Sequence, residues 1–240
     1  MAKYGPSSVS FFLVGGNSLA GTTSTMTYKK IGGAEATDTL GDAWAEATPT
    51  GRLSAELSQT GWFAAAANST VSTFVGNEQT SQVVCVAPSG GTAGANVTLF
   101  EGGFGAEVER LIEKEGLHKL NCSYNVSGAV EEGKVVEALA AQTATGNSAS
   151  LDNSASSASG GSAYLQVTAK SGTSPTMAVK VQHSADDATF VDLITFTTAS
   201  DITAERKTVS GTVNRYLRVN RTVGGSSTPS MTYVVMFARG

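Results

Sequence analysis

The amino-acid sequence predicts a mostly β protein made of two β domains. Three observations lead to this prediction: short runs in which apolar and polar residues alternate, frequent glycine and serine between those runs, and a low charged content. The chain has 240 residues with 27 glycines, and only 15% of its residues are charged. Small and β-branched residues in short runs, separated by turn-forming residues, are typical of strands. A helical protein would be richer in Leu, Glu and Lys.

The first strands are expected near the N-terminus. Residues 8–14 form an apolar run that ends at two glycines, and residues 49–51 (Pro-Thr-Gly) are expected to form a turn. In the stretch that follows, Leu53, Ala55 and Leu57 alternate with polar residues. A period of two is the mark of a strand with one buried face.

One short helix and five further strands complete the N-terminal part. Residues 64–76 are alanine-rich and end at a glycine, which favours a helix. We expect strands within residues 80–91 and 94–105, at residues 106–115 and 117–126, and a last one at residues 133–143. The strand at 106–115 is ambiguous, since its paired charges also suit a helix.

The composition changes at residues 143–162, which are nearly all Ser, Ala, Gly, Asn and Thr. Such a segment cannot fill a core, so we interpret it as a linker. The β pattern restarts beyond it, where Val179 and Val181 alternate with polar residues. We therefore divide the chain into a β domain at residues 1–142, a linker at 143–162, and a β-sandwich or jelly-roll domain at 163–240.

The two cysteines, Cys85 and Cys122, lie in apolar or alternating runs, and we expect both to be buried free thiols. A disulfide between them is the alternative, although two cysteines make no framework. The apolar run at residues 9–14 is too short for a signal peptide, and no segment approaches the length of a membrane span. We expect a soluble protein that stays in the cytoplasm in which it is made.

The two histidines suggest little chemistry. His183 precedes Asp186 and Asp187, and these three residues are the best candidate for a metal site. Divalent metals need several convergent ligands, however, and two adjacent aspartates are more typical of a solvated hairpin turn. His118 is interpreted as a surface histidine.

No catalytic constellation emerges from the sequence. There is no G-x-S-x-G elbow, and the run GGFGAE lacks the lysine and spacing of a phosphate loop. The carboxylates of the central region are interpreted as an exposed acidic loop or strand face; they are Glu101, Glu107, Glu109, Glu113, Glu115, Glu131 and Glu132. We expect no catalytic, cofactor-binding or metal site, no cofactor, and no enzymatic activity.

Basic residues concentrate near the C-terminus, and two interpretations of them are open. They either form a contact surface for an anionic partner or glycan, or they face outward from an antiparallel sheet without a partner. The residues are Arg206, Lys207, Arg215, Arg218, Arg221 and Arg239. The net charge of the whole chain is −4, so no basic footprint indicates that it grips nucleic acid.

The segment TDTLGDAWAEATPTGRLSAELSQTGWFAAAA, which begins at Thr37, resembles part of the tail tube proteins of long-tailed bacteriophages. The shared order is a threonine-rich lead, Gly-Asp, an aromatic residue, and a strand that ends in Gly-aromatic-Phe. The runs VVCVAPSGG, GANVTLFEGG and LNCSYNVSGAVEEGKVV follow in a similar order, so the resemblance covers residues 1–140. The C-terminal part is similar to small β-sandwich or jelly-roll domains appended to phage structural proteins.

The resemblance implies a β-barrel or sandwich with a flanking helix that assembles into rings, usually of six copies. Stacked rings would form a hollow filament in the virion tail, with DNA passing through the lumen without sequence-specific binding. Such a tail is assembled in the host cytoplasm, with other tail or head–tail connector proteins as partners, and the C-terminal domain would face outward. Two alternatives are another virion component, such as a capsid decoration protein or tail terminator, and a carbohydrate-binding module.

Overall fold

The computed structural model describes all residues except 1–8, 38–46, 64–72, 76 and 113. The described part is almost entirely β, as predicted. Its strands, in chain order, are β1 (Phe11–Val14), β2 (Asn17–Ser18), β3 (Thr23–Ala36), β4 (Ala47–Trp62), β5 (Gln82–Ala87), β6 (Asn96–Leu111), β7 (Lys119–Gln142), β8 (Gly146–Asn147), β9 (Leu151–Asp152), β10 (Gly161–Ser184), β11 (Val191–Thr195), β12 (Thr203–Val209) and β13 (Tyr216–Arg239).

The strands are hydrogen-bonded into one sheet in the order β11-β10-β13-β7-β6-β5-β1-β2, with β3 and β4 joined through β7 and with β12 joined to β10. This sheet is open. Of the two forms that we expected for the N-terminal part, a barrel or a sandwich, the barrel is therefore excluded. The sheet is folded into layers because its longest strands bend. Strands β10 and β13 pair along almost their whole lengths, with register shifts at residues 167–176.

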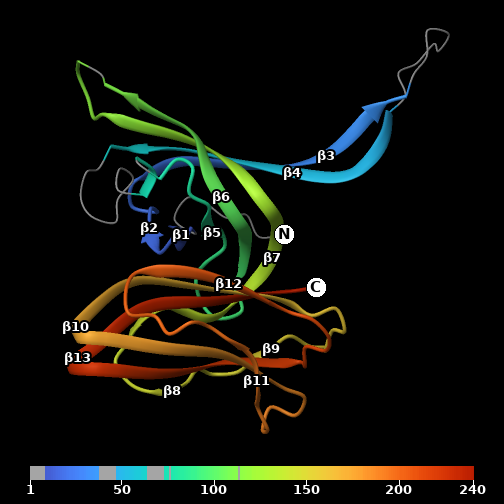
Figure 1. Ribbon diagram of the computed structural model, residues 1–240, viewed down its shortest axis with the longest axis vertical. Helices are drawn as coiled ribbons and strands as arrows, with labels where there is room; N and C mark the ends of the chain where they lie inside the picture. Colours follow the sequence, from blue (N-terminus) through green and yellow to red (C-terminus); the bar gives the residue numbers. More distant parts are fainter. Residues whose placement is uncertain (1–8, 38–46, 64–72, 76, 113) are drawn as a thin grey trace.

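Four stacked layers result, and three apolar cores lie between them (Figure 1). The first layer contains β3, β4, the first half of β7 and the second half of β6. The second contains β1, β2, β5 and the first half of β6. The third contains the ends of β7 and β13, the start of β10, and β12, while the fourth contains β8, β9, β11 and the remaining halves of β10 and β13.

The third layer is buried on both faces, and its sequence shows why. In the run YVVMFA of β13, Tyr233 and Val235 face the core shared with the fourth layer, while Val234 and Met236 face the core shared with the second. Strands that are covered on both faces have nearly continuous apolar sequences. The pattern in the fourth layer is a simple alternation, because only its inner face is covered.

Several elements predicted from the sequence differ from those in the structure. Residues 49–51, expected as a turn, lie inside β4, where Gly51 has a φ of 71° and the pairing with β3 shifts register. Turn-forming residues here make a bulge instead of a reversal. The strands expected at residues 117–126 and 133–143 are parts of the single strand β7, and residues 106–111 belong to β6. Of the helix expected at residues 64–76, the described residues Thr73 and Phe74 are helical, and most of the rest lies outside the described residues.

The Ser/Ala/Gly-rich segment at residues 143–162 is fastened to β13. Strands β8 and β9 pair with β13, the hydroxyl of Ser148 accepts a hydrogen bond from the amide of Val219 at 2.9 Å, and Leu151 packs on the core of the third and fourth layers. Short polar residues that cannot fill a core can still form hydrogen bonds with the backbone N–H and C=O groups of an edge strand. The segment is therefore not a free linker, while the division of the chain into two domains stays a prediction.

Candidate interaction surface

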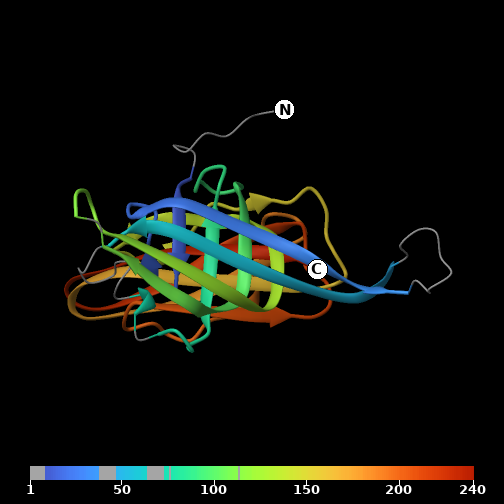
Figure 2. The same cartoon turned by 90° about the horizontal axis from the view of Figure 1, so that it is seen from above.

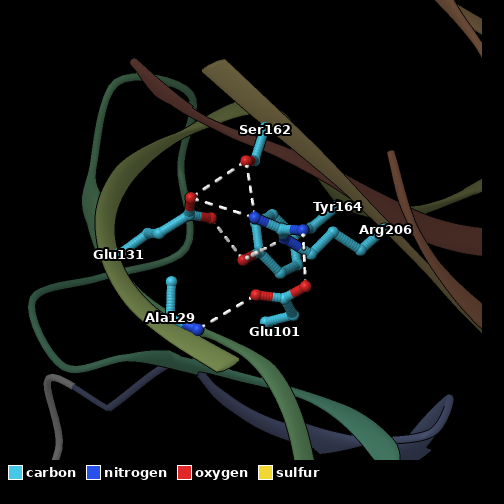
Figure 3. Close-up of polar contacts among 6 residues, drawn as sticks. All are labelled: Glu101, Ala129, Glu131, Ser162, Tyr164 and Arg206. Atoms are coloured by element: carbon cyan, nitrogen blue, oxygen red, sulfur yellow. Dashed lines mark hydrogen bonds and ion pairs between the residues drawn. The ribbon is translucent and has the colours of Figure 1, made fainter. Parts of the chain in front are cut away.

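A polar cluster fastens the second layer to the third, and Figure 3 shows its members. Arg206 on β12 places one guanidinium nitrogen 3.0 Å from Glu101 on β6 and another 3.1 Å from Glu131 on β7. The amide of Ala129 donates to the second oxygen of Glu101 at 3.0 Å. Charged groups that are this well paired and hydrogen-bonded can be removed from water without a large penalty.

Tyr164 on β10 completes this cluster. Its phenol donates a hydrogen bond to Glu131 and accepts one from Nε of Arg206 at 2.9 Å, and burial together with Glu131 raises the pKa of the phenol. The hydroxyl of Ser162 donates to Glu131 at 2.9 Å and accepts from Arg206 at 2.9 Å. Each side chain of the cluster is engaged within it, so the arrangement joins the two layers.

A second Tyr–Glu–Arg set lies on the opposite face of the third layer. Arg221 donates to Glu137 at 2.7 Å, and the phenol of Tyr233 donates to the same carboxylate. Burial raises the pKa of Glu137, while Tyr233 and Arg221 act to lower it. Glu131 and Glu137 are six residues apart on β7, so a regular strand would place them on one face. Register shifts between β7 and β13 over Tyr233–Met236 direct Glu137 to the other face.

The basic residues of the C-terminal part are held by partners within the chain. Besides Arg206 and Arg221, Arg215 forms two hydrogen bonds with Asp152 at 2.7 and 2.5 Å. Arg239 donates to the backbone carbonyls of Val213 and Asn214. Arg218 stacks over Phe190 at 3.9 Å, and Lys207 lies 3.2 Å from Glu205. The surface for an anionic partner that we considered is therefore largely used for internal contacts.

The candidate metal ligands do not converge. Asp186 accepts hydrogen bonds from Ser184 and from the amides of Ala188 and Thr189, so it closes the turn between β10 and β11. His183 accepts a hydrogen bond from the amide of Asn214 at 3.1 Å. Within the described ranges, no group of three His, Cys, Asp or Glu side chains is placed to hold a metal ion. In the same part of the chain, no helix is long and apolar enough to span a membrane.

Both cysteines are buried free thiols, as predicted. Cys85 lies in the core between the second and third layers, and burial raises its pKa to about 12. Cys122 lies in the core between the first and second layers, and burial raises its pKa to about 11. Since the thiolate is the reactive form, neither residue is a candidate nucleophile.

The outer face of the first layer is polar and carries most of its charge as carboxylates. Cross-strand rows place Ser58 of β4 and Ser123 of β7 beside Glu107 of β6, and Thr60 and Asn121 beside Glu109. Glu56 and Lys29 pair across β3 and β4 on the same face. A hollow of about 260 Å³ lies here between β3, β4 and β7, and Lys29 and Glu56 are among the residues that line it. It is smaller than most sites that enclose a small molecule. The sequence predicted an acidic strand face for Glu107 and Glu109, which are exposed.

The two edges of the first layer carry open backbone groups. Among the described residues, β3 pairs with β4 alone, and residues 105–111 of β6 pair with β7 alone. A free edge is a template for pairing with another chain.

The far half of the β3–β4 hairpin leaves the body, as Figures 1 and 2 show. We call residues 32–36 and 47–53 the ribbon. Of its residues whose side chains are described, all but Gly33 are exposed, and the glycines at 32 and 51 face open space. An isolated two-stranded ribbon is marginally stable in water. The ribbon is therefore a candidate contact surface.

Comparisons with known proteins give weak likenesses. No family model and no curated protein matches the chain. It is similar to a protein in the tail of an empty GTA particle with C6 symmetry, at 12% identity over 45% of this chain and 80% of that one, with a TM-score of 0.37. It is also similar to the SPP1 Dit protein, described as a paradigm of the hub adsorption apparatus in phages that infect Gram-positive bacteria, at 10% identity over 96% of this chain and 98% of that one, with a TM-score of 0.36.

A third likeness, to a structure of infectious bursal disease virus strain Gx, has 11% identity over 90% of this chain and 50% of that one, with a TM-score of 0.26. At such identities and TM-scores, the three likenesses establish neither the family of this chain nor what it does.

Proposed function

We propose that this chain is a structural subunit of a phage tail, which closes into rings and stacks as a hollow tube for the passage of DNA. The observation that carries the proposal is the first layer, which ends in two free edges and a ribbon without a core. Charged and polar groups elsewhere in the described body are largely engaged with one another, so association and not turnover is the better supported role. The resemblance of residues 1–140 to tail tube proteins points the same way.

The directions of the two edges suit ring closure. All pairings within the first layer are antiparallel, so β3 and β6 run in opposite directions. The β3 edge of one copy can therefore join the β6 edge of the next and continue the antiparallel pattern. Because the joined edges differ, the contact is head-to-tail, and it gives a closed ring when the rotation between copies divides a full turn. Six copies is the number implied by the resemblance.

In such a ring, the outer face of the first layer would line the channel. Glu56, Glu107 and Glu109 would face the lumen among hydroxyl and amide groups. Carboxylates repel the phosphates of DNA, so the wall would let DNA slide instead of binding it. The fourth layer would then lie outward, on the far side of the body from the channel.

Imaging and mass measurement of the purified full chain test this proposal. Light scattering on a sizing column and negative-stain microscopy are expected to show rings, and tubes as concentration rises. Hydrogen exchange in β3 (Thr23–Ala36) is expected to slow on assembly, because outward-facing amides become paired. A protein that stays monomeric at high concentration would refute the proposal, and rings with unchanged exchange in β3 would refute the pairing of edges.

A further inference from the structure

Two polar atoms are shielded from solvent between the first and second layers. They are the phenol oxygen of Tyr124 on β7 and the side-chain carbonyl oxygen of Gln82 on β5, and neither has a hydrogen-bond partner among the described residues. Tyr124 is only 3% exposed, and its ring packs edge-to-face against Phe74 with the centroids 5.2 Å apart. Nearly all buried polar groups in native proteins are hydrogen-bonded, so these two atoms call for a partner.

The same two residues line a small cavity of about 10 Å³. Its wall includes Cys122 of β7, which like Tyr124 is 3% exposed and belongs to the apolar core between the two layers. Further polar side chains on the wall are those of Thr73, Asn77 and Thr80. A water molecule requires about 10–15 Å³ of such space and about two to four polar partners. The cavity therefore fits one water molecule and nothing larger.

The two unpartnered atoms have complementary hydrogen-bonding roles. Burial raises the pKa of the Tyr124 phenol, with a smaller contribution from Cys122, so the hydroxyl keeps its proton and can donate it. The side-chain carbonyl oxygen of Gln82 can only accept. A water molecule accepts and donates at the same time, so a single one can bridge the phenol to the amide oxygen.

A glycine lets the chain close over this cavity. A Cβ at Gly105 of β6 would lie 3.3 Å from the Cα of Glu78 and 3.4 Å from its carbonyl oxygen. Asn77 and Thr80, on either side of Glu78, both line the cavity, as does Gly105. A larger residue at position 105 would press against the backbone that forms this wall, so the absence of a side chain keeps the cavity small and covered.

We propose that this cavity holds one ordered water molecule, which accepts a hydrogen bond from the phenol of Tyr124 and donates one to the side-chain carbonyl oxygen of Gln82. The water connects β7 of the first layer to β5 of the second, and it is therefore part of the fold. The site lies within a single chain, so it does not depend on the proposed function and is present with or without assembly.

A structure of the full chain at a resolution that shows ordered water tests this site directly. Crystallography, or electron microscopy of any assembled material, is expected to show one peak about 3 Å from each of the two oxygen atoms. A direct hydrogen bond between Tyr124 and Gln82, or a cavity without a peak, would overturn the proposal.

The variant Tyr124→Phe provides an independent test, because the sign of its effect depends on the water. With water bound, the variant loses one hydrogen bond, and the equilibrium constant for unfolding should rise about three- to tenfold in denaturant titration. In a dry cavity, the variant would remove an unpaired buried hydroxyl and would be at least as stable as the wild type, which would refute the water. The matched control is Tyr28→Phe. Tyr28 is 41% exposed and keeps its ring contact with Phe100, so this control is expected to match the wild type.

Discussion

The third and fourth layers differ from the first layer in how far their charged groups and strand edges find partners within the chain. In the third and fourth layers, both Tyr–Glu–Arg sets are internally paired, the arginines bind within the chain, and the segment at residues 143–162 covers the edge of β13. Among the described residues of the first layer, both edges lack a partner strand, the ribbon is exposed to solvent, and four large apolar side chains are exposed, namely Trp62, Leu111, Ile112 and Leu117. The polar groups of the first of these regions are paired within the chain, whereas the proposed function assigns the exposed groups of the other region to contacts between copies.

The largest expected effect tests the self-sufficiency of the third and fourth layers. Arg221→Met removes the cation that accompanies the buried carboxylate of Glu137, and leaving such a charge alone costs about 3–5 kcal/mol. We expect the free energy of unfolding to fall by that amount at neutral pH, as measured by denaturant titration. The double variant Arg221→Met with Glu137→Gln should recover part of the loss, because no charge is then left unpaired.

The pH dependence of this variant gives a second check. Burial already raises the pKa of Glu137, and loss of Arg221 removes one of the groups that lower it. A carboxyl whose folded pKa exceeds its unfolded pKa binds its proton more tightly in the folded state. The deficit of Arg221→Met is therefore present above the folded pKa and shrinks as pH falls through it. A deficit that grows in acid would contradict this account of Glu137.

A pair of glycine substitutions compares the body with the ribbon directly. A Cβ at Gly133 would lie 2.7 Å from the carbonyl oxygen of Phe237 and 2.8 Å from Cδ1 of Leu99, whereas a Cβ at Gly32 meets nothing within 4 Å. We expect Gly133→Ala to destabilise the chain by about 1–3 kcal/mol, since packed backbone must move. Gly32→Ala should change stability by at most about 0.5 kcal/mol. Equal effects in thermal unfolding would show that the ribbon is as constrained as the body.

The alternation of apolar and polar residues predicted the β class and many of the buried positions. Ala55 and Leu57 in β4, and Val179 and Val181 in β10, are buried as the period of two indicated. Strand lengths were underestimated, because β7 changes which face it buries at its irregularities, and a change of face looks like a strand end.

The polar cluster could not be predicted, for a different reason. Glu101, Glu131 and Arg206 come from β6, β7 and β12, which the sequence separates by 30 and 75 residues. Their meeting depends on how bent strands stack into layers, and no local pattern encodes that stacking. The open edges were likewise hidden, because whether a strand is central or at an edge is decided by its neighbours and not by its own residues.

The two thiols report how firmly each region is held. Cys122 lies in the first layer and faces the second, Cys85 lies in the second layer and faces the third, and both are buried. Labelling of a buried thiol requires local opening, and the less supported layer should open more often. In the single-thiol variants Cys85→Ala and Cys122→Ala, we expect the remaining Cys122 to react with a thiol reagent at least tenfold faster than the remaining Cys85. A tenfold ratio corresponds to about 1.4 kcal/mol between the openings. Faster labelling of Cys85 would reverse the proposed ranking of the layers.

The smallest effect is expected at the turn between β10 and β11, in the fourth layer. Backbone hydrogen bonds from Thr189 and Ala188, with the hydroxyl of Ser184, lower the pKa of Asp186 from 3.8 to about 2. A carboxyl with a lowered folded pKa adds stability above its unfolded pKa and loses it as pH falls through the folded one. Asp186→Ala should therefore lower Tm slightly at neutral pH, and the difference should narrow between about pH 4 and about pH 2.

The neighbouring aspartate provides the control for that turn. Asp187 has a φ of 59°, a conformation that asparagine also tolerates, so Asp187→Asn keeps the backbone and removes only the charge. We expect its Tm to match the wild type across the same pH range. If the two variants lost stability equally, net charge and not the hydrogen bonds to Asp186 would account for the effect. The hydrogen bonds to Asp186 would then add no measurable stability to this turn. The contrast between the two regions would be confined to their apolar cores.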